Sequence, residues 1–260
     1  MTEAAGPLPS RPVLSREIWL VFALSLGADG AVALVRFLDD LAHGGLARQQ
    51  AILNSSLAPG RPWLDLALQL LSIAITLVPV ALVAHFLGRS GEGLAVLGLD
   101  RRRPGSDLAR GTVLAAIVGG TGLGFYLASR AAGVNLTVVP ETLPAIWWRI
   151  PVLLLSAAQD GLLEETLVAG YLLHRLRQLG WGENRALLVS AVLRGSYHLY
   201  QGLGGFAGNL VMGLLFGRLY QRWGRVAPLV VAHTLIDAVA FVGYVLLAGH
   251  VSWLPAPRAG

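Results

Sequence analysis

The sequence predicts an all-α fold, a polytopic membrane helix bundle of about seven transmembrane helices. Only 13% of the 260 residues are charged, whereas soluble domains contain about 25% charged residues. Hydrophobic residues make up 55% of the chain, so burial of much of the surface in a bilayer is the simplest interpretation. Long apolar segments separated by short polar stretches are the third observation that favours this fold.

The prediction of about seven transmembrane helices rests on seven apolar segments. Most of them have about the 20 residues that an α-helix needs to cross a bilayer. They occupy residues 17–38, 63–87, 111–130, 147–173, 184–201, 203–222 and 226–247. The first follows Arg11 and Arg16 but precedes no convincing cleavage site, so it is interpreted as a retained helix rather than a signal peptide. The fourth is longer than a span requires and is expected to tilt or protrude. The fifth and sixth nearly meet at Gly202, which predicts a tight helical hairpin.

The whole chain, residues 1–260, is predicted to be a single integral membrane domain without internal repeats. Its net charge of +5 comes from arginine, since the chain has no lysine, and no cysteine is present. The absence of cysteine excludes disulfides and cysteine-ligated metals. Because the arginines gather between apolar segments, we expect contact with lipid headgroups of the bilayer and no nucleic acid partner.

The distribution of arginines predicts the orientation. Thirteen arginines lie in the N-terminal segment and in the regions after the second, fourth and sixth segments, and four lie on the opposite side. Cytoplasmic loops are enriched in basic residues. We therefore expect a multi-pass protein of the cell membrane with a cytoplasmic N-terminus, in which residues 39–62 form an external loop.

Ionisable side chains in the last four segments, about residues 147–247, mark a candidate site. A charged group in hydrocarbon costs about 2.5 kcal/mol or more, so it needs a partner or a function. The polar residues of these segments are Gln159, Asp160, Glu164, Glu165, Arg194, His198, Asn209, His233 and Asp237. His233 and Asp237 are four residues apart and share one helix face, as do Arg194 and His198.

These residues form three motifs in order. Glu164 and Glu165 begin the run EETLVA, Arg194 and His198 bound the run RGSYH, and His233 begins the run HTLID. In this the chain resembles the CPBP (CAAX protease and bacteriocin-processing) family of intramembrane proteases, whose successive helices carry EExxxR, FxxxH and HxxxN or HxxxD. The resemblance extends over about residues 160–237.

The resemblance implies an intramembrane endopeptidase that acts on a membrane-associated or peptide substrate. One glutamate and His198 would activate a water molecule, while His233 and Asp237 would hold the oxyanion or complete the polar shell. Zinc remains possible, since two histidines and a carboxylate suffice to bind it, and a metal-free mechanism fits equally well. Two alternatives stay open: a non-catalytic membrane scaffold or immunity protein that kept the fold, and a small transporter with proton-relaying acids.

The chain departs from the family pattern at two positions. Ala169 replaces the arginine of the first motif, and Arg194 replaces the phenylalanine of the second. Either the guanidinium is supplied from the fifth helix, in which case Arg194 should contact Glu164 or Glu165, or the active site has decayed. We favour the first interpretation, because an unpaired arginine in hydrocarbon is costly. Glu164, Glu165, His198 and His233 are then expected to line one cavity.

The remaining polar residues are assigned structural or interfacial roles. Asp29 and Arg36 in the first segment share a helix face and are expected to pair or to pack against the bundle. Tyr197 and Asp160 are expected to be structural. His174 lies near the end of the fourth segment and is expected to be solvated or interfacial.

Overall fold

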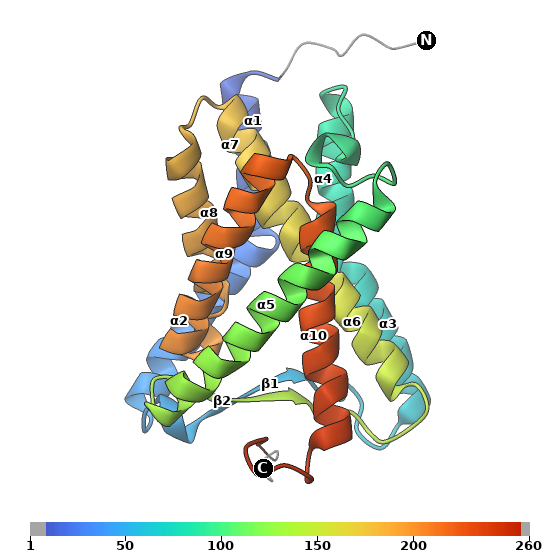
Figure 1. Cartoon of the computed structure of the whole chain (residues 1–260), viewed down its shortest axis with the longest axis vertical. Helices are drawn as coiled ribbons and strands as arrows, with labels where there is room; N and C mark the ends of the chain where they lie inside the picture. Colours follow the sequence, from blue (N-terminus) through green and yellow to red (C-terminus); the bar gives the residue numbers. More distant parts are fainter. Residues whose placement is uncertain (1–8, 256–260) are drawn as a thin grey trace.

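The computed structural model describes residues 9–255 and is built almost entirely from helices (Figure 1). The first half contains α1 (Arg11–Ala23), α2 (Leu26–Ala42), η1 (Leu46–Arg48), β1 (Gln50–Asn54), α3 (Pro62–Thr76), α4 (Val78–Arg89), η2 (Leu94–Leu97) and α5 (Pro104–Ala131). The second half contains β2 (Thr137–Glu141), α6 (Arg149–Glu164), η3 (Glu165–Leu172), α7 (Leu173–Gln178), α8 (Glu183–Tyr197), η4 (Leu199–Gln201), α9 (Leu203–Trp223) and α10 (Ala227–Leu247).

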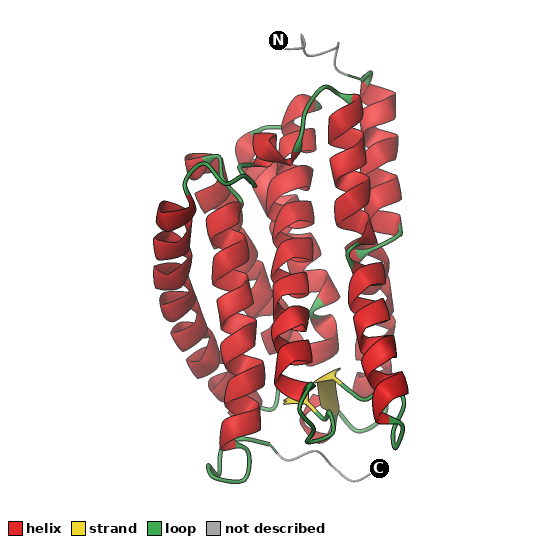
Figure 2. Cartoon of the chain, turned by 90° about the vertical axis from the view of Figure 1, so that its right-hand side faces the viewer, coloured by secondary structure: helices red, strands yellow, loops and turns green. Residues whose placement is uncertain are grey.

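The helices form columns that run along the length of the bundle (Figure 2). By its bounds, each predicted apolar segment corresponds to one column. Two of the columns are interrupted. The first is bent by 49° between α1 and α2, where the Ser25 hydroxyl donates to the Val21 carbonyl (2.6 Å). The second is interrupted at Leu77, two residues before Pro79, which lacks the N–H of a continuous helix.

A multi-pass membrane protein is supported by the length and composition of these helices. Within residues 9–255, three helices are long and apolar enough to cross a membrane, or four if the bent α1–α2 pair is one span. The columns that contain α6, α8 and α9 fall outside this group, and α6 and α8 carry the polar residues of the first two motifs. The total of seven spans therefore stays a prediction.

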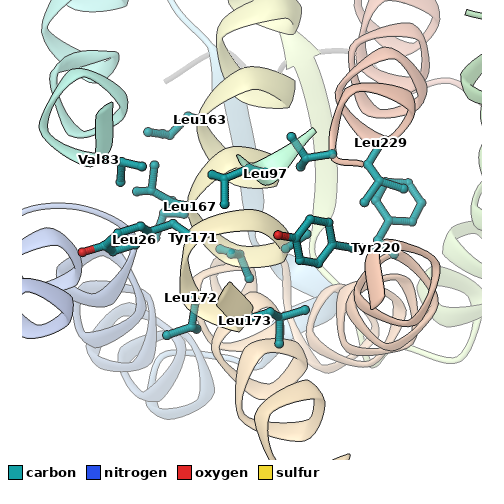
Figure 3. Close-up of a cluster of buried hydrophobic side chains, with 14 of the residues drawn as sticks. Leu26, Val83, Leu97, Leu163, Leu167, Tyr171, Leu172, Leu173, Tyr220 and Leu229 are labelled. Atoms are coloured by element: carbon teal, nitrogen blue, oxygen red, sulfur yellow. The ribbon is translucent and has the colours of Figure 1, made fainter. Parts of the chain in front are cut away.

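The α6–η3–α7 column is the central element of the bundle. All eight residues of η3 are buried, so this stretch is surrounded by protein on every side. Figure 3 shows its leucines and Tyr171 packed among side chains from α2, α4, η2, α9 and α10. Gly161 allows α10 to approach closely, since a Cβ there would lie 2.5 Å from the Thr234 hydroxyl oxygen. This close contact brings the first and third motifs together.

A small parallel sheet of β1 and β2, which the sequence does not predict, lies at the end of the bundle where α10 finishes (Figure 1). Gln50 is opposite Thr137, and Asn54 is opposite Glu141. The hairpin of α8 and α9 is as tight as predicted: Gly202 has a positive φ of 103°, and the Gln201 carbonyl accepts from the amide of Leu136 just before β2.

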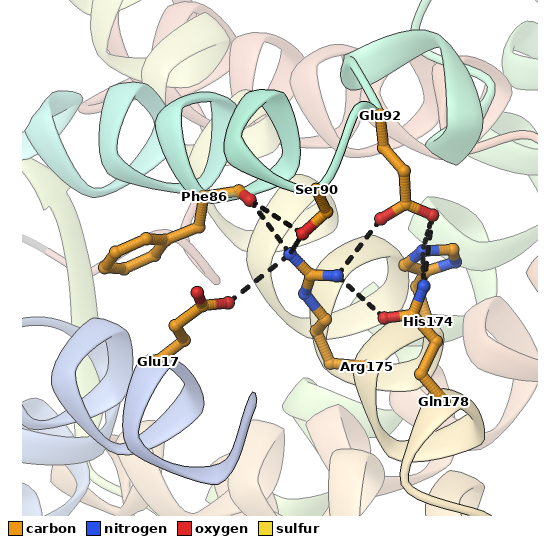
Figure 4. A network of polar contacts seen from close by, with 7 residues as sticks. All are labelled: Glu17, Phe86, Ser90, Glu92, His174, Arg175 and Gln178. Atoms are coloured by element: carbon orange, nitrogen blue, oxygen red, sulfur yellow. Dashed lines mark hydrogen bonds and ion pairs between the residues drawn. The ribbon is translucent and has the colours of Figure 1, made fainter. Parts of the chain in front are cut away.

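At the opposite end of the bundle, two residues differ from their predicted environments. Arg175 is one of the arginines after the fourth apolar segment, where the sequence predicts a cytoplasmic loop, but it lies in α7 and is fully buried. His174 is buried rather than solvated and contacts Glu92 (2.9 Å). Figure 4 shows both side chains inside a polar network between α1, α4 and α7. Their partners come from distant parts of the chain, so the local sequence carries no sign of this burial.

The orientation can be tested with single cysteines, because the native chain has none. Arg102→Cys lies beside α5 at the arginine-rich end, and Arg61→Cys precedes α3 at the β1–β2 end; both positions are exposed. We expect a membrane-impermeant maleimide to label Arg61→Cys in intact cells and Arg102→Cys only after the cells are opened. The opposite pattern would overturn the predicted orientation.

Candidate functional site

The three sequence motifs converge in the interior of the bundle. Glu164 ends α6 and Glu165 begins η3, while Arg194 lies in the last turn of α8 and His198 caps it. His233 projects from α10, which packs against α6. The arrangement therefore unites side chains from three separate helices.

Arg194 is the central cation of the site. Its Nη1 lies 2.7 Å from Glu165 Oε1 and its Nη2 lies 3.3 Å from Glu164 Oε2. The predicted contact between the guanidinium of α8 and the acid pair is confirmed, and it extends to both glutamates rather than one. The side chain is 1% exposed, and its guanidinium lies over the Phe216 ring (5.5 Å). Gly213 makes room for it, since a Cβ there would lie 3.2 Å from Arg194 Cδ.

His233 lies between two carboxylates. Its Nδ1 is 2.8 Å from Glu165 Oε1, and its Nε2 is 3.3 Å from Asp237 Oδ2 on the same helix. Arg194 Nη2 lies 3.2 Å from Nδ1. Asp237 thus contacts His233 as the spacing of four predicts, and the imidazole is held at both nitrogens.

Glu164 and His198 are each oriented by a neighbour. The Tyr197 hydroxyl donates to Glu164 Oε2 (2.8 Å). His198 Nδ1 lies 3.0 Å from the Arg194 carbonyl oxygen, and a carbonyl only accepts, so Nδ1 carries the proton. In the neutral ring, Nε2 is then the nitrogen free to accept a proton.

A cavity of about 530 Å³ joins these groups to the β1–β2 end of the bundle. Its acidic, arginine and histidine lining residues are Asp29, Arg36, Asp160, Glu164, His198, His233 and Asp237. The prediction that Glu165 also lines the cavity is wrong: its side chain is 0% exposed and lies behind the wall, against Arg194 and His233. Successive helical residues point in different directions, so Glu164 faces the cavity while Glu165 faces the protein interior.

Sequence reasoning undervalued several residues of this cavity. Tyr197 and Asp160 were assigned structural roles, yet Tyr197 holds Glu164, and Asp160 lies in the cavity wall. Asp29 and Arg36 both line the cavity, and no ion pair joins them within the described part of the chain. Asp160 lies four residues before Glu164 and so shares its helix face, which is a signal in the sequence that places Asp160 beside the site.

The donor arrangement does not fit a zinc ion. A catalytic zinc site needs three protein ligands with free donor atoms. The predicted set of His198, His233 and a carboxylate lacks a free nitrogen at His233, because both of its ring nitrogens face carboxylates and the Arg194 guanidinium lies beside Nδ1. Within residues 9–255, no group of three or more His, Asp or Glu side chains is placed to hold a metal.

Comparison with known proteins agrees with the motif geometry. Residues 146–239 match the family described as type II CAAX prenyl endopeptidase Rce1-like. No curated protein and no solved structure matches the chain. The matched segment runs from the start of the α6 column into α10 and contains all three motifs. These motifs, their order and their convergence on one cavity support the resemblance of this part of the chain to CAAX-type intramembrane proteases.

Proposed function

We propose that this chain is an intramembrane endopeptidase in which Glu164 is the general base. The observation that carries the proposal is the position of Glu164 in the cavity wall, held by Tyr197 and Arg194. A carboxylate fixed by two donors presents a defined geometry to a water molecule in the cavity. His198 lines the same cavity with Nε2 free.

In the proposed reaction, Glu164 removes a proton from water as the water oxygen attacks the carbonyl carbon of the scissile peptide bond. The unprotonated Nε2 of His198 accepts a hydrogen bond from the same water molecule and so orients its oxygen for the attack. The proton held by Glu164 then passes to the amide nitrogen as the carbon–nitrogen bond breaks. His233 and Asp237 complete the polar wall, and Arg194 and Glu165 are positioning residues behind it.

The proposal is tested with purified protein in lipid nanodiscs and a library of internally quenched decapeptides. The native protein is expected to cleave members of the library, and Glu164→Gln is expected to abolish cleavage while the protein stays folded. Glu183→Gln, the same substitution at an exposed position on α8, is the matched control and should retain activity.

Two results would contradict the proposal. Equal cleavage by the native protein and Glu164→Gln would remove Glu164 from the reaction. A folded native protein that cuts no member of the library would favour the non-catalytic scaffold.

A further inference from the structure

Strand β1 has an edge that no other strand covers. The sheet has two strands in the described part of the chain, with β2 on one side of β1. In a strand, the N–H and C=O of one residue point to one edge and those of the next residue to the other. The Gln49 carbonyl accepts from the amide of Thr137, so the main chain of Gln49 faces β2. Ile52 is three residues farther along the chain, and the alternation therefore places its N–H and C=O on the opposite edge.

This uncovered edge faces the cavity that contains Glu164. Successive side chains of a strand point to opposite faces, so a cavity on one face would be lined by every second residue. Here residues 52–55 all line the cavity. Consecutive residues can line one cavity when the strand presents its edge to it. No residue of β2 contributes to the lining of this cavity, so β2 lies behind β1. The cavity therefore has main-chain hydrogen-bonding groups at one end and Glu164 and His198 farther inside.

We infer that β1 is the docking edge for substrate, and that an extended peptide pairs with the main chain of Ile52. This inference rests on the proposed endopeptidase function. An extended peptide can add to an open strand edge through main-chain hydrogen bonds, which requires no particular side chain at the paired position. The cavity continues from this edge to the catalytic groups, so the peptide reaches Glu164 from the β1–β2 end of the bundle, opposite the arginine-rich end.

The first test compares Ile52→Pro with Ile52→Ala on the best-cleaved decapeptide of the library. Proline removes the N–H that faces the cavity, and an edge position whose N–H faces away from the sheet tolerates it. Alanine measures the contribution of the side chain alone. We expect KM of the proline variant to be about tenfold above that of the alanine variant, as the loss of one hydrogen bond implies, with a smaller effect on kcat.

The second test does not depend on how well the proline variant folds. Ser55→Cys in the Glu164→Gln chain provides a single cysteine beside the edge, and versions of the decapeptide carry one cysteine at each successive position. Pairing along a strand predicts disulfide capture at alternate peptide positions.

The outcomes separate the docking edge from the endopeptidase function. Uniform capture, or equal KM in the proline and alanine variants, would overturn the docking edge while leaving the endopeptidase intact. A native protein that cleaves no peptide would overturn both.

Discussion

Replacing Arg194 with alanine is expected to abolish peptide cleavage and to lower the free energy of unfolding by roughly 3–5 kcal/mol, because it leaves buried acids without their cation. Glu165 is fully buried, and one of its oxygens already has no hydrogen-bond partner. Glu164 would lose one of the two donors that orient it towards the cavity. Cleavage in nanodiscs and unfolding by titration with sodium dodecyl sulfate measure the two effects.

The control for this prediction is Arg185→Ala, the same substitution on the same helix at an exposed position. Arg185 lies over the Trp181 ring (4.0 Å), and an exposed contact of this kind is worth about 0.5–1 kcal/mol. Its loss should leave cleavage intact. An Arg194→Ala protein with native activity and stability would show that the guanidinium is dispensable.

Two further variants test the shape of the Arg194 side chain and the position from which a guanidinium can be supplied. Arg194→Lys keeps a cation but lacks the planar fork that reaches both glutamates, so partial activity is expected. Adding Ala169→Arg to Arg194→Ala should restore some cleavage, since Ala169 is the motif position of the family arginine and η3 packs against α8. No gain from the second substitution would show that position 169 cannot replace position 194.

Much of the fold follows from apolar segments alone, since each predicted segment became one helical column. The parallel sheet does not follow from them. Strand β1 is five residues long, and β2 includes Pro140, a residue that argues against a strand when a sequence is read alone. Pairing between these segments is a tertiary contact that brings together residues 87 positions apart, such as Gln50 and Thr137.

The candidate site was predictable where helical spacing determines contacts. Asp237 contacts His233 because residues four apart share a face, and Arg194 contacts the acid pair because a buried guanidinium needs one. The burial of Glu165 was not predictable in the same way. It depends on the packing of α8 and α10 around η3, a π-helical stretch whose turn differs from that of an α-helix.

The buried side chain of Arg175 connects several elements at one end of the bundle (Figure 4). Its Nη1 lies 3.0 Å from Glu92 Oε2, and its Nη2 lies 3.4 Å from Glu17 Oε2. It also donates to the Phe86 carbonyl and the Ser90 hydroxyl of α4 and its cap. One side chain thus joins α1, α4 and α7. Arg175→Met preserves much of the apolar volume but leaves Glu17, which is 3% exposed, without a cation.

We expect Arg175→Met to lower the free energy of unfolding by roughly 3–5 kcal/mol, the cost of breaking a buried ion pair by removing one partner. The matched control is Arg177→Met on the same helix, where the side chain is exposed and a change within about 0.5 kcal/mol is expected. Adding Glu17→Met to Arg175→Met should recover part of the loss, because it removes the stranded charge and substitutes an apolar side chain. Equal unfolding midpoints for the Arg175→Met and Arg177→Met proteins in detergent titrations would show that the network does not hold this end of the bundle together.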